Sequence, residues 1–321
     1  MANREQIEQQ VAFALGQTDF AWLGKKYSGK VRDNYVAGDR RFILVTDRLS
    51  AFDRVIAPIP FKGQVLNRLA EFWFAQTKHI VPNHLLAVPD PNAMVVQECD
   101  PLPIEVVVRG YLTGVTNTSI WTHYQHGERV FCGHKLADGM VKNQRLPEPL
   151  LTPSTKAAKG DHDESVSAEE IVRRGLLTPE MMQQLTEVSL NLFRFGSEVL
   201  AKRGLILVDT KYEFGLREGK LTLIDEIHTP DSSRFWIRDS YADRFARGEE
   251  PEKMDKEFLR EWLAQRGFRG EGEIPAIPTD VVVETAARYI AAAERIMGEP
   301  MSLEVGDVAS RLERNLRQYL A

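Results

Sequence analysis

The sequence predicts an α+β protein whose strands and helices occupy separate blocks of the chain. Two regions, 22–112 and 205–228, are rich in short extended runs of β-branched and aromatic residues. Apolar residues recur at helical spacing before, between and after these regions, which predicts helices that pack behind the sheets. A length of 321 residues is enough for about two domains of this kind.

The composition argues against several classes of protein. The chain carries 41 Lys and Arg against 46 Asp and Glu, a net charge of −5, so nucleic acid is not an expected partner. No apolar run reaches the roughly 20 residues of a membrane helix. The N-terminal segment lacks the apolar core of a secretion signal, so we expect a cytoplasmic protein that does not bind membranes. Cys99 and Cys132 can form neither a disulfide framework nor a structural zinc site.

The N-terminal region reads as one helix followed by strands. An amphipathic helix is expected over Arg4–Leu15. KKYSGKVRDNYVAG predicts two strands joined near Gly29, and RRFILVTD predicts a buried third strand. A helix over 64–78 and the strand-like runs AMVVQECD and PIEVVVRGYL follow. Because two prolines stiffen the connector between these two runs, we place a domain boundary there. The expected domains are residues 1–102 and 103–321.

The rest of the chain combines a loop-rich stretch, a hairpin and several helices. The stretch 114–165 is rich in Gly, Pro, Thr and His and has weak periodicity, which is typical of a functional loop system. GLILVDTKYEFGL and KLTLIDEIHT predict a β-hairpin that turns near Gly219. Capping residues and apolar spacing predict helices over residues 167–174, 178–203, 255–266, 279–297 and 303–320.

The segment LVDTKYEFG carries the strongest chemical signal. On a strand, Asp209, Lys211 and Glu213 share one face, and the next strand adds Asp225 and Glu226. This face is either a solvated sheet edge or a ligand site, because packed carboxylates repel one another unless a cation or substrate lies between them. Glu213 with Asp225 or Glu226 is therefore a candidate Mg²⁺ pair, since Mg²⁺ favours one or two carboxylates plus phosphate oxygens.

The register of the hairpin decides which carboxylate faces Glu213. If the numbers of paired residues sum to 438, Glu213 lies opposite Asp225. If they sum to 437, Ile224 lies opposite and Glu226 shares the face of Glu213. The residues alone leave both registers open.

Other polar clusters each have a functional and a structural interpretation. SGKVRD is either a phosphate clamp, with Gly29 allowing close backbone approach, or a basic surface hairpin. TDRLSAFD is either a ligand site at a strand end or a plain turn. Arg109 binds either an anionic ligand or an acid such as Glu105. The loop 152–164 is either a flexible surface loop or a lid, and TPDSSR suits the recognition of phosphate or carboxylate.

Taken together, six segments resemble the SAICAR synthetase family in the same order along the chain. They are SGKVRD, TDRLSAFD, PIEVVVRGYLTG, TPSTKAAKGDHDE, LVDTKYEFG and IDEIHTPDSSRFW. The loop from Thr152 to Glu164 and the helical tail resemble the longer, fungal-like branch. The resemblance implies a two-domain α+β fold with an ATP-grasp-like or kinase-like nucleotide cleft. It also implies ligation of the carboxylate of carboxyaminoimidazole ribonucleotide (CAIR) to the amine of L-aspartate with ATP and Mg²⁺, giving SAICAR, ADP and phosphate in de novo purine biosynthesis.

The same resemblance assigns roles to individual residues. ATP would be held by the hairpin and by the backbone of the 97–103 connector, through Gly29, Lys30, Val31, Arg32, Leu102 and Glu213. Mg²⁺ would be held by Glu213 and Asp225, which favours the register that sums to 438. The catalytic residues would be Arg109, Asp209 and Lys211. The other substrate contacts would be Ser50, Asp53, Thr116, Lys156, Asp163, Ser233 and Arg234.

One residue departs from the family pattern. A serine that contacts substrate usually follows the Thr/Ala-Gly step, whereas this chain has Val115 after Gly114. Thr116 or Ser119 could supply that hydroxyl instead. We expect either a monomer or a homodimer.

Overall fold

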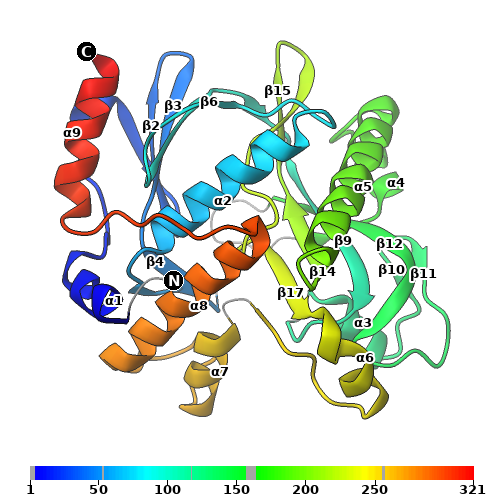
Figure 1. Cartoon of the computed structure of the whole chain (residues 1–321). Coiled ribbons are helices and arrows are strands. Elements are labelled where there is room, and N and C mark those ends of the chain that lie inside the picture. Colours follow the sequence, from blue (N-terminus) through cyan, green and yellow to red (C-terminus); the bar gives the residue numbers. More distant parts are fainter. Residues whose placement is uncertain (1–3, 53, 117, 157–163, 255–256) are drawn as a thin grey trace.

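Figure 1 shows the computed structural model of the chain, which describes residues 4–52, 54–116, 118–156, 164–254 and 257–321. Its helices are α1 (Arg4–Gln10), α2 (Lys62–Thr77), α3 (Ile120–Gln125), α4 (Ala168–Arg173), α5 (Pro179–Ala201), α6 (Arg238–Ala246), α7 (Glu257–Gln265), α8 (Thr279–Met297) and α9 (Val308–Leu320). Single 3₁₀ turns cover Val11–Phe13 and Ala21–Leu23. The α+β class that the sequence predicts is confirmed.

Within the described residues, the strands form two five-stranded sheets and three smaller ones, and every pair of neighbouring strands in them is antiparallel. The first large sheet has the order β1 (Lys25–Ser28), β2 (Arg32–Ala37), β3 (Arg40–Val45), β7 (Ala93–Gln97), β6 (Leu85–Asp90). The second has the order β13 (Glu164–Ser165), β12 (Gln144–Thr155), β9 (Ile104–Leu112), β14 (Leu205–Tyr212), β17 (Ser233–Ile237). The smaller sheets are β16 (Lys220–Leu223), β15 (Phe214–Arg217), β8 (Asp100–Pro101); β4 (Arg48–Ala51), β5 (Arg54–Pro58); and β10 (Val130–Phe131), β11 (His134–Lys135).

The apolar run of β3 is continuous because both faces of the first sheet are covered. Phe42 and Leu44 belong to an apolar cluster that contains Leu312 of α9. Ile43 and Val45 point to the other face and belong to the main core, which includes α2. Strands that are buried on both faces lose the alternation of apolar and polar residues, which explains the pattern of this segment.

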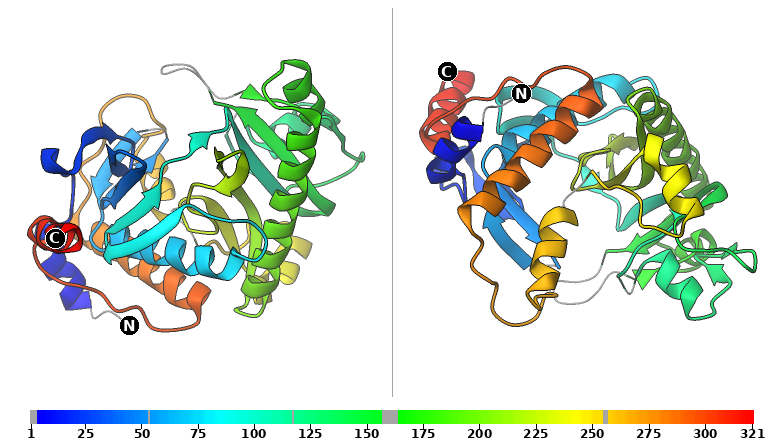
Figure 2. Two further views of the ribbon diagram at one scale, coloured as in Figure 1. Left: turned by 90° about the horizontal axis from the view of Figure 1, so that it is seen from above. Right: turned by 60° about the horizontal axis from the view of Figure 1, so that its bottom comes forward.

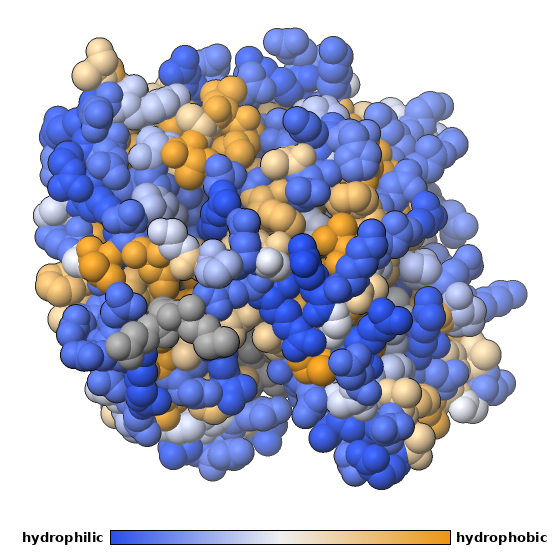
Figure 3. Space-filling view, in the orientation of Figure 1, coloured by the Kyte–Doolittle hydropathy of each residue, from blue (hydrophilic) through white to orange (hydrophobic). Residues whose placement is uncertain are grey.

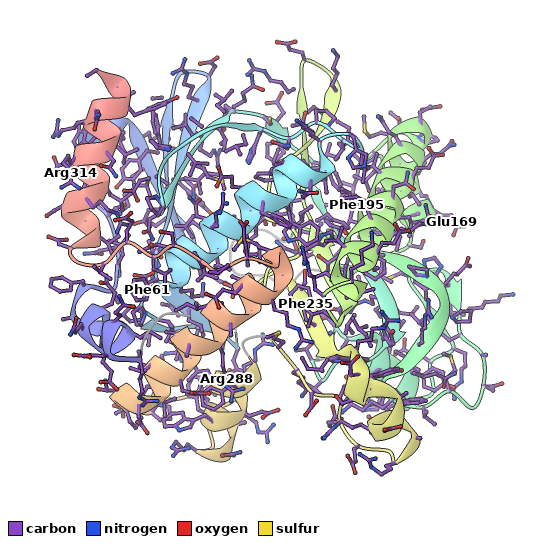
Figure 4. All side chains as sticks on the ribbon, viewed as in Figure 1. Phe61, Glu169, Phe195, Phe235, Arg288 and Arg314 are labelled. Carbon is purple, nitrogen blue, oxygen red and sulfur yellow. The ribbon has the colours of Figure 1, made fainter. Side chains whose placement is uncertain are left out.

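The second sheet carries α5 on one face. Thr178 caps this helix by accepting a hydrogen bond from the amide of Met181, and Pro179 occupies the first turn. The buried face of α5 packs on β14, β9 and β12, and Figure 2 shows the helix on the outer side of that sheet. Phe235 of β17 and Phe61, just before α2, are both buried in the main core (Figure 4).

The C-terminal helices pack against N-terminal elements. Helix α8 contacts α2 and α1, and α9 contacts β6, so the chain returns to the first sheet after it has completed the second (Figure 1). Arg311 of α9 binds Asp90 in the buried end of β6, with 3.1 Å between Nε and Oδ2. The domain boundary at Leu102 stays a prediction.

One sequence expectation about this fold is wrong. Residues 144–155, expected within a loop system, form the long strand β12. The segment lacks a strand-like sequence pattern because it contains Pro147, Pro149 and Pro153, which donate no ladder hydrogen bonds. The pairing with β9 is also irregular, since its register shifts between Arg145 and Leu150. Helix α6 was not expected at all, and none of its residues is buried.

The surface seen in the orientation of Figure 1 is mostly hydrophilic (Figure 3). Charged side chains such as Glu169 of α4 and Arg314 of α9 are exposed. Among the described residues, none of the helices has the length and apolar character required to cross a membrane.

Candidate active site

A cleft of about 660 Å³ brings together segments from both large sheets. One side is formed by the β1–β2 hairpin, β3 and β4, and the other by the ends of β12 and β14 and by the segment after β16. The cleft is lined by nine residues that the sequence predicts as site residues, namely Gly29, Lys30, Val31, Arg32, Ser50, Lys156, Lys211, Glu213 and Asp225. Residues 22–53 and 205–228, far apart in the chain, therefore meet here as one site.

The hairpin between β1 and β2 carries the first group of cations. The amide of Gly29 donates to the carbonyl of Arg32 at 2.8 Å, which closes the turn. Arg32 crosses the cleft, where its guanidinium binds Asp225 and lies 2.8 Å from Glu226 Oε1. Burial alone would lower the pKa of Arg32, but the two carboxylates outweigh burial and raise it. Arg32 is therefore a permanent positive charge in the cleft.

Lys211 lies at the centre of the carboxylate cluster. Its Nζ binds Glu213 and lies 3.4 Å from Asp225 Oδ2 and 3.5 Å from Glu105 Oε1. Lys156, at the end of β12, lies 2.6 Å from Glu213 Oε2. The side chains of Glu213 and Asp225 are only 18% and 14% exposed, so the alternative of a solvated sheet edge is wrong.

The pKa values of Asp225 and Glu226, the two neighbouring acids after β16, shift in opposite directions. Burial would raise the pKa of Asp225, but Arg32 and Lys211 outweigh it and lower that pKa below its ordinary value. Burial raises the pKa of Glu226, and the charge of Arg32 only partly opposes this. Asp225 is therefore the acid that stays ionised most readily.

The register of the β15–β16 hairpin differs from the one that the resemblance favoured. Phe214 pairs with Leu223 and Gly215 with Thr222, so paired numbers sum to 437 and the expected sum of 438 is wrong. Ile224 lies opposite Glu213, and its amide donates to the Glu213 carbonyl at 3.1 Å. Asp225 nevertheless reaches Lys211 beside Glu213, because β16 ends at Leu223 and strand alternation no longer applies beyond it.

A second charged cluster lies along β14, two residues before Lys211. Asp209 pairs with Arg109 of β9 on one side and with Arg234 of β17 on the other, so the three residues are cross-strand neighbours. Arg234 Nη1 lies 2.5 Å and Arg109 Nη1 lies 3.8 Å from Asp209 Oδ2. Arg109 Nε also donates to Thr152 Oγ1 at 2.9 Å. Arg109, for which the sequence left a pairing with Glu105 open, thus pairs with Asp209.

Three further predicted residues are described and are not part of the charged contacts of these two clusters. Leu102 is buried, and its amide donates to the Phe214 carbonyl at 2.9 Å. Ser233 is buried and donates to Thr210. Thr116 is exposed. Asp53 and Asp163 lie outside the described residues.

Ser119 and Arg234 both lie close to Gly114. A β-carbon at Gly114, where φ is +112°, would lie 2.3 Å from Ser119 Cβ and 3.6 Å from Arg234 Nη1. Ser119 also caps α3 by accepting from the amide of Thr122. Thr116 and Ser119 were the two candidates for the hydroxyl that Val115 lacks. Of these two, Ser119 lies near the same glycine as Arg234 of the second cluster.

Sequence reasoning missed several residues that line the cleft. His84 follows α2 and is buried, and burial lowers its pKa to about 4. Asp231 belongs to a motif recognised in the sequence but was given no role, and its carboxylate binds Lys62 at 2.7 Å. Arg260 reaches the cleft from α7. His84 and Arg260 lie in ordinary helical or loop sequence, so no local pattern marks them.

Comparison with known proteins identifies the family. The SAICAR synthetase family profile matches residues 25–276. The chain belongs to the SAICAR synthetase family. It is 48% identical over 312 residues to the phosphoribosylaminoimidazole-succinocarboxamide synthase of Legionella pneumophila, covering 96% of this chain and 99% of that protein. It is 51% identical over 301 residues to a putative second synthase of Agrobacterium fabrum, covering 92% of this chain and 95% of that one.

A solved SAICAR synthetase has the same fold. The SAICAR synthase of Saccharomyces cerevisiae, solved in complex with SAICAR, superposes with a TM-score of 0.79 at 32% identity, covering 90% of this chain and all of that one. As a SAICAR synthetase, this chain is a C–N ligase (EC 6.3.2.6) that uses ATP to join CAIR and L-aspartate in purine biosynthesis.

Proposed function

We propose that the cleft is the ATP site of this ligase, with the phosphates along Gly29–Arg32 and the adenine against the 97–103 connector. Two cations of the hairpin, Lys30 and Arg32, line the cleft and suit a polyphosphate. Gln97, Glu98, Cys99 and Pro101 of the connector line the same cleft, and Gln97 pairs with Arg40 at the start of β3. A cationic hairpin and a backbone connector that line one cleft form an arrangement that can bind both ends of a nucleotide.

Glu213 and Asp225 suit Mg²⁺ in the presence of a nucleotide. No group of three or more His, Cys, Asp or Glu side chains within the described ranges is arranged to hold a metal by itself. Two hard carboxylates facing one lysine nevertheless match Mg²⁺, which takes its other ligands from phosphate oxygens and water. When bound, the ion would neutralise charge on the transferring phosphoryl group. Lys211 and Lys156 would then turn from the carboxylates to the anionic substrates.

The second cluster suits the ribonucleotide substrate. Arg109 and Arg234 place two guanidinium groups on either side of Asp209, and together they carry a net positive charge that can bind phosphate or carboxylate. Lys211 follows Asp209 on the same face of β14, so it links this cluster to the carboxylates that suit Mg²⁺. We assign CAIR to this position, between the second cluster and the ATP phosphates.

The chemistry that follows is activation of a carboxylate and then attack by an amine. A carboxylate oxygen of CAIR bonds to the γ-phosphorus of ATP, and the bond from that phosphorus to the bridging oxygen of ADP breaks. The amine of aspartate then bonds to the activated carbonyl carbon, phosphate leaves with the shared oxygen, and the nitrogen gives up a proton. Lys30, Arg32 and Lys211 stabilise the negative charge during the first step. No side-chain nucleophile is required.

The remaining residues of the proposed site are assigned roles from their positions. Asp209 is the candidate proton acceptor, although its carboxylate also positions Arg234. Ser50 and Lys156 line the cleft and can contact substrate. Asp53, Thr116, Asp163 and Ser233 are assigned as further substrate contacts from their place in the sequence motifs alone. The oligomeric state, monomer or homodimer, stays a prediction.

The observation that carries the assignment is the convergence of Arg32, Lys211, Glu213 and Asp225 in one cleft. A coupled assay in which CAIR, aspartate and ATP are each omitted in turn tests the substrate set. We expect ADP and SAICAR in equal amounts only when all three are present. ADP formed at full rate without aspartate, and without amide product, would indicate a kinase reaction instead.

A further inference from the structure

The side chain of Arg48 binds the backbone of the β1–β2 hairpin, although Arg48 does not itself line the cleft. Its Nε donates to the carbonyl of Lys30 at 3.0 Å, and Nη2 donates to the carbonyl of Gly29 at 3.1 Å. Nη2 also lies 2.9 Å from Asp33 Oδ1, and Nη1 donates to the carbonyl of Gly16 at 2.7 Å. One guanidinium thus joins the hairpin tip, its second strand and the N-terminal segment.

Thr46 and Thr18 add further hydrogen bonds to the hairpin and to Asp33. Thr46 Oγ1 donates to the carbonyl of Val31 at 2.7 Å, and the Thr46 amide donates to the same oxygen at 3.1 Å. The carboxylate of Asp33 is fixed on its other oxygen by the amide and hydroxyl of Thr18, at 2.8 and 3.0 Å. The side chain of Arg48 is only 13% exposed and that of Asp33 is fully buried, so solvent competes little for the ion pair between them.

The hydrogen bonds from Arg48 and Thr46 set the direction of three successive peptide groups. In a trans peptide the N–H points opposite to the C=O of the same unit. Because the carbonyls of Gly29, Lys30 and Val31 point to Arg48 and Thr46, the amides that follow them point away from those two side chains. Arg48 and Thr46 do not line the cleft, whereas Gly29, Lys30 and Val31 do. The positive ends of these peptide dipoles are thus left unobstructed by Arg48 and Thr46, on a hairpin whose residues line the cleft, which is the condition for an anion-binding nest.

We propose that Arg48 is a positioning residue that orients the hairpin amides toward the nucleotide phosphates. The proposal rests on the proposed function, in which the hairpin binds those phosphates. Arg48 does not need to touch ATP for this role. A lysine could replace its charge beside Asp33 but could not donate to Gly29, Lys30 and Gly16 at once, because one ammonium lacks the planar fork of donors.

The test compares binding of ADP and of adenosine, which share the base and ribose but differ in the phosphates. Binding constants are measured by titration calorimetry, with competition for weak ligands, for the full chain and for the variants R48K, R48A and T46V. We expect R48K to weaken ADP binding by at least about tenfold, equivalent to about 1.4 kcal/mol, and adenosine binding by less than about twofold. R68A, which removes an exposed arginine of α2, serves as the matched control and should change neither.

Each outcome separates this role from the alternatives. Equal weakening of ADP and adenosine by R48K and T46V would mean that Arg48 only supports the fold, and would overturn the proposal. K30A tests the proposed function separately. If K30A weakens ADP binding while R48K does not, the hairpin binds phosphate but Arg48 does not orient it. If neither variant changes ADP binding, the phosphates do not lie on the hairpin and the proposed nucleotide site fails with it. R48K keeps the test valid if R48A does not fold.

Discussion

Arg32 and Glu226 form an ion pair across the cleft, with 2.8 Å between Nη2 and Oε1. The pair joins the β1–β2 hairpin to the segment after β16, nearly two hundred residues further along the chain. Arg32 also binds Asp225, so two acids on one side compete for one guanidinium on the other. A nucleotide phosphate would take over part of that guanidinium and leave a carboxylate available to a cation.

Glu213 is the first test of the metal assignment. We expect Glu213→Gln to lower kcat by at least about two orders of magnitude, because a neutral amide is a poor ligand for Mg²⁺ and removes the carboxylate that Lys211 and Lys156 share. Steady-state kinetics at saturating substrates measure this. Glu128→Gln, which changes an exposed acid paired with His123, is the control and should keep full activity. Normal turnover by the Glu213 variant would remove this residue from the metal site.

The choice between Asp225 and Glu226 can be made by magnesium titration. Asp225 lies beside Lys211 and Glu213, whereas the described ion pair of Glu226 is with Arg32. We therefore expect Asp225→Asn to raise the Mg²⁺ concentration for half-maximal activity at least about tenfold, an effect of about 1.4 kcal/mol. Glu226→Gln should change it much less. A larger effect of Glu226→Gln would assign the metal to Glu226.

His228 makes the stability of the fold depend on pH. Its ring is fully buried, contacts the Trp73 ring edge-on and shares a 2.7 Å hydrogen bond with Tyr212, and burial lowers its pKa to about 3. The unfolded chain protonates this histidine near pH 6.5, so its contribution is complete above that pH and is lost as the pH falls toward 3. Urea unfolding should show wild-type stability falling more steeply with acid than that of His228→Asn.

The size of this effect between pH 6.5 and 5 is about 2 kcal/mol, since each unit of pKa difference contributes about 1.4 kcal/mol. Asparagine is chosen because it tolerates the positive φ of 54° at this position. His84, whose pKa is also lowered, is present in both proteins and cancels in the comparison. If the free energy of unfolding changed equally with pH in the wild type and in His228→Asn, His228 would not be the source of the pH dependence.

Gly196 on α5 is required by the same histidine. A β-carbon there would lie 2.3 Å from Cε1 and 2.7 Å from Nδ1 of His228. Alanine usually stabilises a helix interior by about 1 kcal/mol relative to glycine, but here we expect Gly196→Ala to lower the free energy of unfolding by about 1–3 kcal/mol through overpacking. Thermal and urea denaturation measure it, with Ser197→Ala as the neighbouring control. A stabilised variant would show that the ring can move aside.

Much of the fold follows from local sequence, and the exceptions have physical causes. The strands β2 and β3 and the helices α5 and α8 have clear periodicity and clear ends, and the structure confirms them. Strand β12 was missed because its prolines imitate a loop, and its pairing with β9 comes from long-range contacts. The register of the β15–β16 hairpin is fixed by its turn, whose geometry the sequence left open, and the position of Asp225 depends on where β16 ends.

The candidate site was likewise predictable from the sequence only in part. Lys30, Arg32, Lys211 and Glu213 stand in compact motifs, so their chemistry could be recognised before their positions were known. Arg48 also stands in such a motif, but its contacts with Gly29 and Lys30 depend on how β4 passes beneath the hairpin. The role of Arg260 depends on the packing of α7, which no short motif encodes.

The central claim is that ATP activates the CAIR carboxylate by direct phosphoryl transfer. The most direct measurement uses CAIR labelled with ¹⁸O in that carboxylate, together with ATP, Mg²⁺ and aspartate, and analyses the inorganic phosphate by mass spectrometry. We predict that one ¹⁸O atom appears in phosphate for each SAICAR formed, because the oxygen that attacks the γ-phosphorus leaves with it. Phosphate without the label, at full yield of SAICAR, would contradict this account.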